Sequence, residues 1–276
     1  VRRDLLIDGT NGDVDTVAVL IPPRPDEAFE SSDTRMWSVC SWCIDSHYVT
    51  AIAIAPFVFG VLPLQETPAQ AVTRPPRQIL IIGLGGGSLD MFWLQLNRNM
   101  NMTVLELEEE VMQLAHDWFG VREERLRRTV IGDGVDFIRT AAVLFYELII
   151  TGNMKYDVVV VDACDLDSAL PCPAAPFLRE ETIRDASSIL ARDGIFVVNV
   201  LSSDGKESGI QKVFFSFFYL KILAHFGSCF RLSVSVEDNV VVVCSPKTAP
   251  DSAALSRFYF SRIEAAINTF KLKQVV

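Results

Sequence analysis

Apolar and polar residues follow one another in blocks that predict strands and helices in turn. From residue 77 onward, apolar runs of strand length are separated by amphipathic stretches of helical length. This alternation predicts an α/β fold with a parallel sheet and crossover helices. We expect strands at 78–82, 103–107, 128–131, 156–161 and 195–200. We expect helices after residue 88 and at 109–119, 135–149, 180–190 and 213–226, the last fully buried, with a turn at 192–194.

The end of the chain predicts a different kind of strand pairing. Two apolar runs, 230–236 and 240–244, flank a polar turn at 237–239 and indicate a hairpin. Five strands with crossover helices and a terminal hairpin differ from an all-parallel dinucleotide-binding sheet. They fit a Rossmann-like seven-stranded sheet whose last, antiparallel strand lies between the fifth and the sixth.

The N-terminal quarter predicts a separate, smaller unit. Two β-rich runs, 2–7 and 16–21, flank an Asn-Gly turn and predict a hairpin. The apolar segment 49–64 is shorter than a membrane span and contains two prolines, so we expect a buried helix from about Ser46 that ends near those prolines. Further prolines at 68, 75 and 76 indicate a linker. We therefore place a hairpin-and-helix appendage at 1–72 and the main domain at 73–276.

Composition and charge narrow the class of protein. Half of the 276 residues are hydrophobic and the net charge is −10, which predicts a globular chain and argues against a general nucleic-acid binder. An acidic surface leaves room for a cationic substrate. No signal peptide is expected, because Asp8 stops the short apolar run that follows Arg2 and Arg3.

The six cysteines indicate neither a metal site nor a disulfide framework. Cys40-Ser-Trp-Cys43 has redox or zinc spacing, but no second such pair and no histidine cluster accompanies it. We therefore expect small buried thiols in a reducing compartment, a cytoplasmic location and no metal ion.

A glycine-rich turn and an acid mark the ends of the first two strands of the main domain. Glycines at 83–87 let a ligand approach the backbone, and the following helix presents N–H groups at its start. Glu106 ends the second strand, where a carboxylate can bind ribose hydroxyls. A plain tight turn and an exposed acid in the run 106–110 are the structural alternatives. The predicted ligand-binding residues here are Gly83, Gly85, Gly86, Gly87, Glu106 and Leu107.

The later strands end on further polar residues. Asp133 could accept a hydrogen bond from an adenine amino group, and Gly134 could donate its N–H to a ring nitrogen. Asp162 could orient or deprotonate an attacking amine, and Asp165 could pair with a cationic substrate. Asn199 stands in an apolar strand, so its amide needs a partner: a substrate nitrogen or a structural hydrogen bond. The structural alternatives are an ordinary Asp-Gly turn for Asp133 and Gly134, and a capping role for Asp162.

These motifs together resemble one branch of S-adenosylmethionine-binding proteins. The segments are Ile81-Ile-Gly-Leu-Gly-Gly-Gly-Ser-Leu89, Val104-Leu-Glu-Leu-Glu108, Gly132-Asp-Gly-Val-Asp-Phe-Ile138 and Tyr156-Asp-Val-Val-Val-Val-Asp162. They are similar to the spermidine-synthase-like branch, and within it to the methyltransferase-like protein 13 family, C-terminal domain type. The similarity runs from about Cys43 to Cys244.

The resemblance implies a methyltransferase sheet and an S-adenosylmethionine-dependent transfer to a protein amine, such as the N-terminus or a lysine of elongation factor 1-alpha. It implies that the glycines, Glu106 and the Asp133-Gly134 pair hold the cofactor, with Asp162 and Asn199 at the acceptor amine. It also leaves room for a homodimer. Two alternatives remain: a polyamine aminopropyltransferase, and a scaffold without catalysis. Polyamine synthases carry an acid after the third glycine, where this chain has Ser88-Leu89, so aminopropyl transfer is the weaker interpretation.

Overall fold

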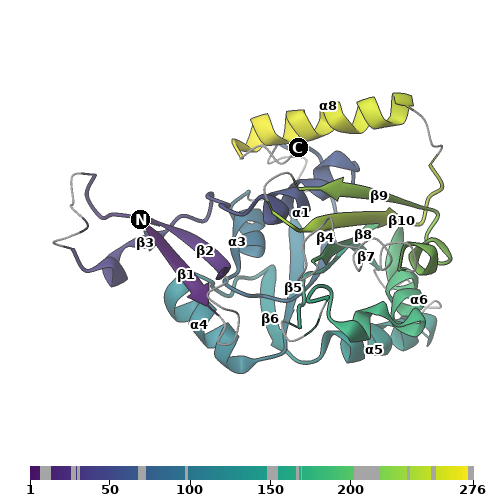
Figure 1. The fold of residues 1–276 in the computed structure, drawn as a ribbon, viewed down its shortest axis with the longest axis horizontal. Coiled ribbons are helices and arrows are strands. Elements are labelled where there is room, and N and C mark those ends of the chain that lie inside the picture. Colours follow the sequence, from purple (N-terminus) through teal and green to yellow (C-terminus); the bar gives the residue numbers. More distant parts are fainter. Residues whose placement is uncertain are drawn as a thin grey trace.

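A seven-stranded sheet with helices on both faces forms the centre of the molecule (Figure 1). In this computed structural model the residues described are 1–6, 14–25, 29, 32–67, 73–96, 99–147, 155–165, 168, 170–201, 218–234, 237–249 and 253–272. The strands of the large sheet are β4 (Arg77–Ile82), β5 (Met100–Glu106), β6 (Arg127–Ile131), β7 (Tyr156–Val161), β8 (Leu190–Val200), β9 (Ser228–Ser233) and β10 (Val240–Ser245).

The strand order confirms the predicted sheet. It runs β6-β5-β4-β7-β8-β10-β9, and β4 to β8 pair in parallel. Strand β10 is antiparallel to both of its neighbours, β8 and β9. The last strand therefore lies between the fifth and the sixth.

Helices cover the sheet in two layers. The main helices are α1 (His47–Val58), α3 (Ser88–Gln95), α4 (Glu109–Phe119), α5 (Gly134–Glu147), α6 (Glu180–Ser188) and α8 (Ala253–Phe270). Alternate residues of each central strand face opposite layers, as a period of two requires. In β4, Ile79 and Ile81 pack with α1 and α3, whereas Leu80 and Ile82 pack on the α5 and α6 side. The sheet is therefore buried on both faces.

Helix α1 belongs to the same core as the sheet. Ala53, Phe57 and their neighbours share one buried cluster with β4, β7 and β8. The helix begins after its capping residue Ser46 and ends at Val58, near the two prolines as predicted, with Pro56 inside its last turn. The domain boundary near residue 73 stays a prediction.

A small three-stranded sheet stands at one side of the molecule (Figure 1). It consists of β1 (Arg2–Leu6), β2 (Val14–Ile21) and β3 (Ser38–Val39), and β1 and β2 form the predicted antiparallel hairpin. The Asn-Gly turn lies outside the described residues. Leu5 and Ala18 pack on Phe119 at the end of α4, which fastens the hairpin to the main domain.

Two local predictions differ from the structure, and one helix was not predicted. Residues 192–194 are not a turn but lie within β8, next to a shift in its register with β7. The described end of the expected 213–226 helix is amphipathic: Phe218 and Ile222 are buried, whereas Leu220 is 67% exposed. Helix α8 was not predicted, and Arg262 on it donates to the carbonyls of Phe57 and Val58 at the end of α1.

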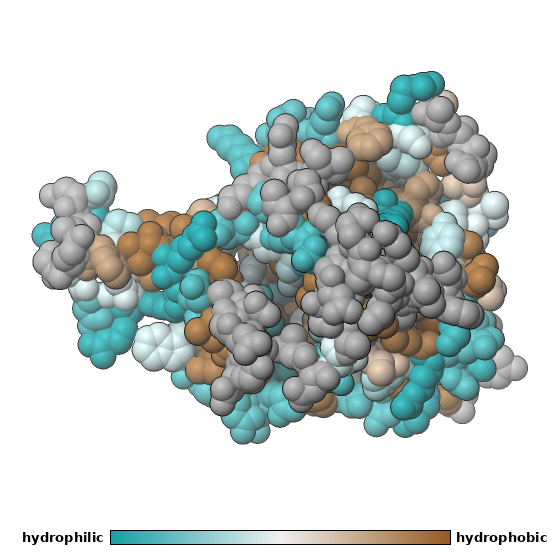
Figure 2. Space-filling view, in the orientation of Figure 1, coloured by the Kyte–Doolittle hydropathy of each residue, from teal (hydrophilic) through white to brown (hydrophobic). Residues whose placement is uncertain are grey.

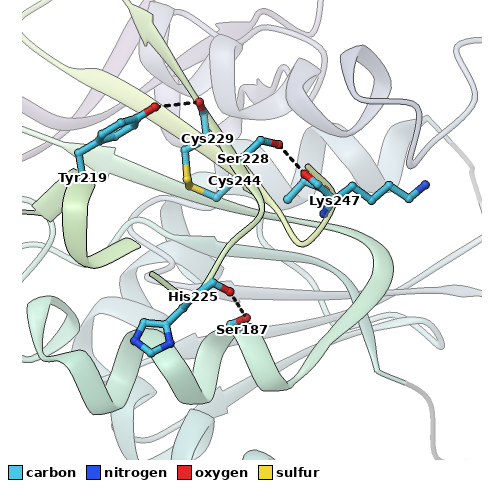
Figure 3. Close-up of a disulfide and its surroundings, with 8 residues drawn as sticks. Ser187, Tyr219, His225, Ser228, Cys229, Cys244 and Lys247 are labelled. Carbon is cyan, nitrogen blue, oxygen red and sulfur yellow. Dashed lines mark hydrogen bonds between the residues drawn. A yellow bond between two sulfur atoms is a disulfide. The ribbon is translucent and has the colours of Figure 1, made fainter. Parts of the chain in front are cut away.

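The prediction of six unpaired thiols is wrong. The bonded pairs are Cys40–Cys43, Cys164–Cys172 and Cys229–Cys244. The third pair joins the neighbouring strands β9 and β10, and Figure 3 shows it beside Tyr219, which donates to the Cys229 carbonyl. Sequence spacing did not reveal these pairs because pairing depends on distance in the fold. No helix in the described ranges is long and apolar enough to cross a membrane.

A buried ion pair ties α3 to the edge of the sheet. The Arg127 guanidinium is fully buried and its Nε donates to Asp90 Oδ2 over 2.8 Å. A second guanidinium nitrogen, Nη1, donates to the Thr129 hydroxyl and to the Glu123 carboxylate. Removing one member of such a pair leaves an uncompensated buried charge, which is more costly than losing an exposed pair.

We predict that Asp90→Ala lowers the free energy of unfolding by about 3–5 kcal/mol, because Arg127 loses its buried partner. Urea denaturation followed by circular dichroism measures this change. The matched control is Asp136→Ala, which breaks the exposed Asp136–Arg139 pair and is expected to cost less than about 1 kcal/mol. Equal losses in the two variants would contradict a stabilising role for the buried pair.

Candidate active site

The predicted site residues gather at one edge of the large sheet. Because β4, β5, β6 and β7 are parallel, their carboxyl ends meet at that edge. The turns that follow these strands carry the glycine loop (residues 83–87), Glu106, Asp133 and Asp162. Residues up to 79 positions apart in the chain are therefore brought to one side of the sheet.

Gly83 brings the glycine loop against the end of β7. Its φ is +97°, and a Cβ at this position would lie 2.2 Å from the carbonyl oxygen of Asp162. The Asp162 N–H donates to the Ile82 carbonyl over 2.8 Å, which holds the two strand ends together. Any side chain at position 83 would push the loop away from Asp162.

Glu106 is buried and its orientation is fixed by backbone donors. Its Oε2 accepts from the Leu84 N–H over 3.0 Å. Its Oε1 accepts from the N–H groups of Leu107 and Glu108 over 2.8 and 3.1 Å. The alternative of an exposed acid is therefore wrong. Leu107 helps to orient Glu106 only through its backbone N–H, because its side chain is 61% exposed.

Asp133 and Gly134 begin helix α5. Asp133 is exposed, and its Oδ1 accepts from the N–H groups of Val135 and Asp136 over 2.7 and 3.2 Å, so it caps the helix. Both bonds use Oδ1, so a ligand could be bound through Oδ2. Gly134 is buried, and a Cβ there would lie 2.4 Å from a methyl carbon of Ile82.

Asp162 lies at the end of a chain of hydrogen bonds. Asn199 Nδ2 donates to Asp162 Oδ1 over 2.8 Å, and Asn239 Nδ2 donates to Asn199 Oδ1 over 2.9 Å. The phenol of Tyr48 donates to the same carboxylate. Asn199 therefore has protein partners on both ends of its amide, which makes it a residue that positions Asp162.

The surroundings of Asp162 change its acidity. Burial raises its pKa to about 6, the Asn199 hydrogen bond opposes the rise, the negative charge of Asp15 adds to it, and the Tyr48 bond opposes it. Burial also raises the pKa of the Tyr48 phenol well above 10, and the charges of Asp162 and Asp15 act in the same direction. Tyr48 therefore stays a hydrogen-bond donor, while Asp162 can take up or release a proton near neutral pH.

Glu237 in the β9–β10 connection positions Tyr48. Its Oε1 accepts from the His47 N–H over 2.8 Å, and its Oε2 accepts from the Tyr48 N–H over 2.7 Å. A carboxylate from a distant hairpin thus satisfies the free N–H groups at the start of α1. The same connection supplies Asn239, so this turn supports both partners of Asp162.

The N-terminal hairpin covers the glycine loop. The Gly86 N–H donates to the Thr16 hydroxyl over 3.0 Å. A Cβ on Gly85 would lie 2.8 Å from Asp15 Oδ2, so the Asp15 carboxylate stands directly over the loop. Only glycines at these positions leave room for strand β2.

Asp165 lies apart from this network. It is exposed, three residues beyond Asp162, in the loop that the Cys164–Cys172 disulfide closes. Its N–H donates to the Pro171 carbonyl over 2.7 Å. In the part of the chain that the structure describes, no group of three or more His, Cys, Asp or Glu residues could hold a metal ion.

Sequence reasoning missed five residues that support the site from other parts of the chain. These are Asp15, Thr16, Tyr48, Glu237 and Asn239, all of which reach the site from outside the βα turns of the parallel strands. Only Tyr48 had a local signal, a polar group two residues after the capping Ser46 at the start of a mostly apolar helix. Together the edge offers carboxylates that could bind a polyhydroxylated ligand and a half-buried acid, Asp162, that could bind a nitrogen nucleophile.

The sequence is similar to that of known transferases. The chain is 28% identical over 163 residues to the mouse eEF1A lysine and N-terminal methyltransferase, across 58% of this chain and 22% of that protein. It is 27% identical over 163 residues to the polyamine aminopropyltransferase of Vibrio vulnificus, across 58% of this chain and 50% of that enzyme. The matched part thus spans about a fifth of the first relative and half of the second.

The fold has a solved counterpart. The crystal structure of human methyltransferase-like protein 13 in complex with SAH matches with a TM-score of 0.63 and 21% identity, over 83% of this chain and 94% of that one. A family model, the spermine/spermidine synthase domain, matches residues 64–213, which is more than half of the chain. The chain therefore belongs to the spermine/spermidine synthase domain family.

Proposed function

We propose that this chain is an S-adenosylmethionine-dependent methyltransferase that N-methylates an amine of a protein. The observation that carries the proposal is the half-buried Asp162, whose pKa is raised to about 6 by the burial of its carboxyl group and which adjoins the glycine loop through Gly83. A carboxylate in that position suits an amine acceptor. The relatives named above as methyltransferases support the same reaction class.

The residues at the sheet edge fit the proposed cofactor. Gly83 and Gly85 have no side chains that would meet the Asp162 carbonyl and the Asp15 carboxylate, and Glu106 presents a fixed, buried carboxylate for ribose hydroxyls. Asp133 and Gly134 would hold the adenine end. When bound, the cofactor supplies an electrophilic methyl group on a sulfonium sulfur.

Catalysis by the protein's own residues would consist mainly of positioning. Asp162 is largely ionised above pH 6 and would accept a hydrogen bond or a proton from the acceptor nitrogen. Tyr48 and Asn199 hold the carboxylate in one orientation through their hydrogen bonds. Asp165, in the exposed loop, would meet the charged surroundings of the acceptor.

A protein acceptor is favoured by the surface beside the site. Figure 2 shows hydrophobic side chains over the projecting N-terminal part. Exposed apolar surface of this kind often marks a binding region for another protein. We propose that the acceptor is the N-terminus or a lysine of elongation factor 1-alpha or of a similar protein. The exposed apolar residues there are Leu6, Ile21, Phe29, Met36 and Trp42.

Aminopropyl transfer to a polyamine is the second candidate, because the family model and the Vibrio vulnificus relative both name that reaction. A small diamine would also meet carboxylates at this edge. Against it stands the loop Gly85-Gly-Gly-Ser-Leu89, which contains no acid after the third glycine. A donor comparison separates the two reactions: turnover of decarboxylated S-adenosylmethionine with putrescine would overturn methyl transfer.

The cytoplasmic location and a homodimer also remain proposals. The three disulfides weigh against the cytoplasm, since such bonds persist mainly in oxidising compartments. Thiol labelling of the protein in intact cells measures the pairing directly. Fully labelled cysteines would support a reducing location.

The central test is transfer of a labelled methyl group from S-adenosylmethionine to proteins of a cell lysate and to purified elongation factor 1-alpha. We expect labelling of an N-terminus or a lysine by the wild type. Asp162→Asn should reduce labelling by about 10²–10⁴-fold while cofactor affinity is kept. If the cofactor binds but the wild type transfers no methyl group to any lysate protein or to elongation factor 1-alpha, the chain is a scaffold without catalysis.

Glu106→Ala should weaken binding of S-adenosylmethionine by about 1.5–3 kcal/mol, the range for hydrogen bonds to a charged group. Isothermal titration calorimetry measures the loss. Glu110→Ala removes an exposed acid four residues further on and serves as the matched control, with unchanged affinity. An unaltered affinity in Glu106→Ala would exclude it from the cofactor site.

The activity should depend on pH through Asp162. Its pKa of about 6 means that the carboxylate is lost below that pH, so kcat/KM should fall as pH decreases through 6. The Tyr48 hydrogen bond lowers this pKa, so Tyr48→Phe should move the acid limb to higher pH. Tyr219→Phe, which loses only its bond to the Cys229 carbonyl, should leave the profile in place. A Tyr48→Phe profile identical to the wild type would refute the assignment.

A further inference from the structure

The carboxylate of Asp15 has no role in the function proposed above, although it lies over the glycine loop of the site. It is the second residue of β2, on the hairpin that covers the glycine loop. Its Oδ2 would lie 2.8 Å from a Cβ on Gly85 and accepts from the Thr16 hydroxyl over 2.9 Å. Thr16 in turn accepts from the Gly86 N–H, so the pair is fixed on the loop.

The charge of Asp15 acts on the proposed acceptor acid and on its tyrosine partner. Its negative charge raises the pKa of Asp162 and of Tyr48. The protein atoms around its own carboxyl group raise the pKa of Asp15, the Thr16 hydrogen bond opposes the rise, and the charge of Glu106 adds to it. The residue as a whole is nevertheless exposed, so a ligand can reach it. Asp15 is therefore close enough for its charge to interact with the proposed ribose-binding acid and with the proposed acceptor acid.

The charge of Glu106 raises the pKa of Asp15, and the charge of Asp15 raises the pKa of Asp162, so a positive charge bound near Asp15 would be stabilised. The proposed cofactor carries a sulfonium and, on its amino-acid end, an ammonium group. The glycine loop and the residues after it, 83–89, contain no acid that could pair with that ammonium. Asp15 places a carboxylate over the loop from a different part of the chain.

We propose that Asp15 binds the ammonium group of the cofactor's amino-acid end and thereby selects cofactors that carry it. This inference rests on the proposed function and extends it to a residue of the N-terminal hairpin. The hairpin then has a part in cofactor binding in addition to the apolar surface that we propose for the acceptor protein. A charge-assisted hydrogen bond of this kind is among the stronger polar contacts in proteins.

The test compares two ligands that share the adenosyl group and differ in the amino-acid end. S-adenosylhomocysteine carries the ammonium, whereas 5′-methylthioadenosine does not. Calorimetry on the full chain should show that Asp15→Asn weakens S-adenosylhomocysteine by about 10-fold and leaves 5′-methylthioadenosine unchanged. Unchanged binding of the second ligand also shows that the variant is folded.

The matched control is Asp4→Asn, which removes an exposed acid from the neighbouring strand of the same hairpin. It should alter neither affinity. Equal weakening of both ligands by Asp15→Asn would overturn the proposal and assign the residue to hairpin closure. No weakening of either ligand would also overturn it. If the wild type binds neither ligand, the proposed function fails together with this inference.

Discussion

The close approach of Gly83 to the carbonyl of Asp162 is the contact on which the rest of the site depends. It occurs because β4 and β7 are neighbours, so that the turn after one strand lies against the end of the other. A Cβ at Gly83 would separate them, since it would overlap the carbonyl oxygen. The proposed cofactor loop and the proposed acceptor acid are therefore set at a fixed distance by backbone packing and not by side-chain adjustment.

Segments from both ends of the chain complete this edge. The β9–β10 connection supplies Glu237, which holds the start of α1, and Asn239, which orients Asn199. The N-terminal hairpin supplies Asp15 and Thr16 over the glycine loop. The sheet thus provides the first contacts, and distant turns fix their orientation. Each turn acts through a charge or an amide that reaches a backbone or side-chain group far away in sequence.

A comparison of the buried Asp90 with the half-buried Asp162 shows how the partners of a carboxylate decide between a structural and a chemical role. Burial raises the pKa of both Asp90 and Asp162. Asp90 faces the Arg127 guanidinium, a permanent cation, so the pair serves to hold α3 on the sheet. Asp162 instead faces the neutral donors Tyr48 and Asn199. Neutral donors orient a carboxylate without neutralising it, which leaves its charge for a ligand.

The sequence by itself determined the sheet and the βα turns at its edge. Near-continuous apolar runs of strand length and helical stretches between them indicate parallel strands, and parallel strands must bring their carboxyl ends together, with Gly83, Glu106, Asp133 and Asp162 there. Only the tertiary structure decided the disulfide pairs, the cap by Glu237 and the place of Asp15. These contacts join segments with no shared periodicity, and their partners are chosen by distance and direction in the folded chain, which local pattern does not encode.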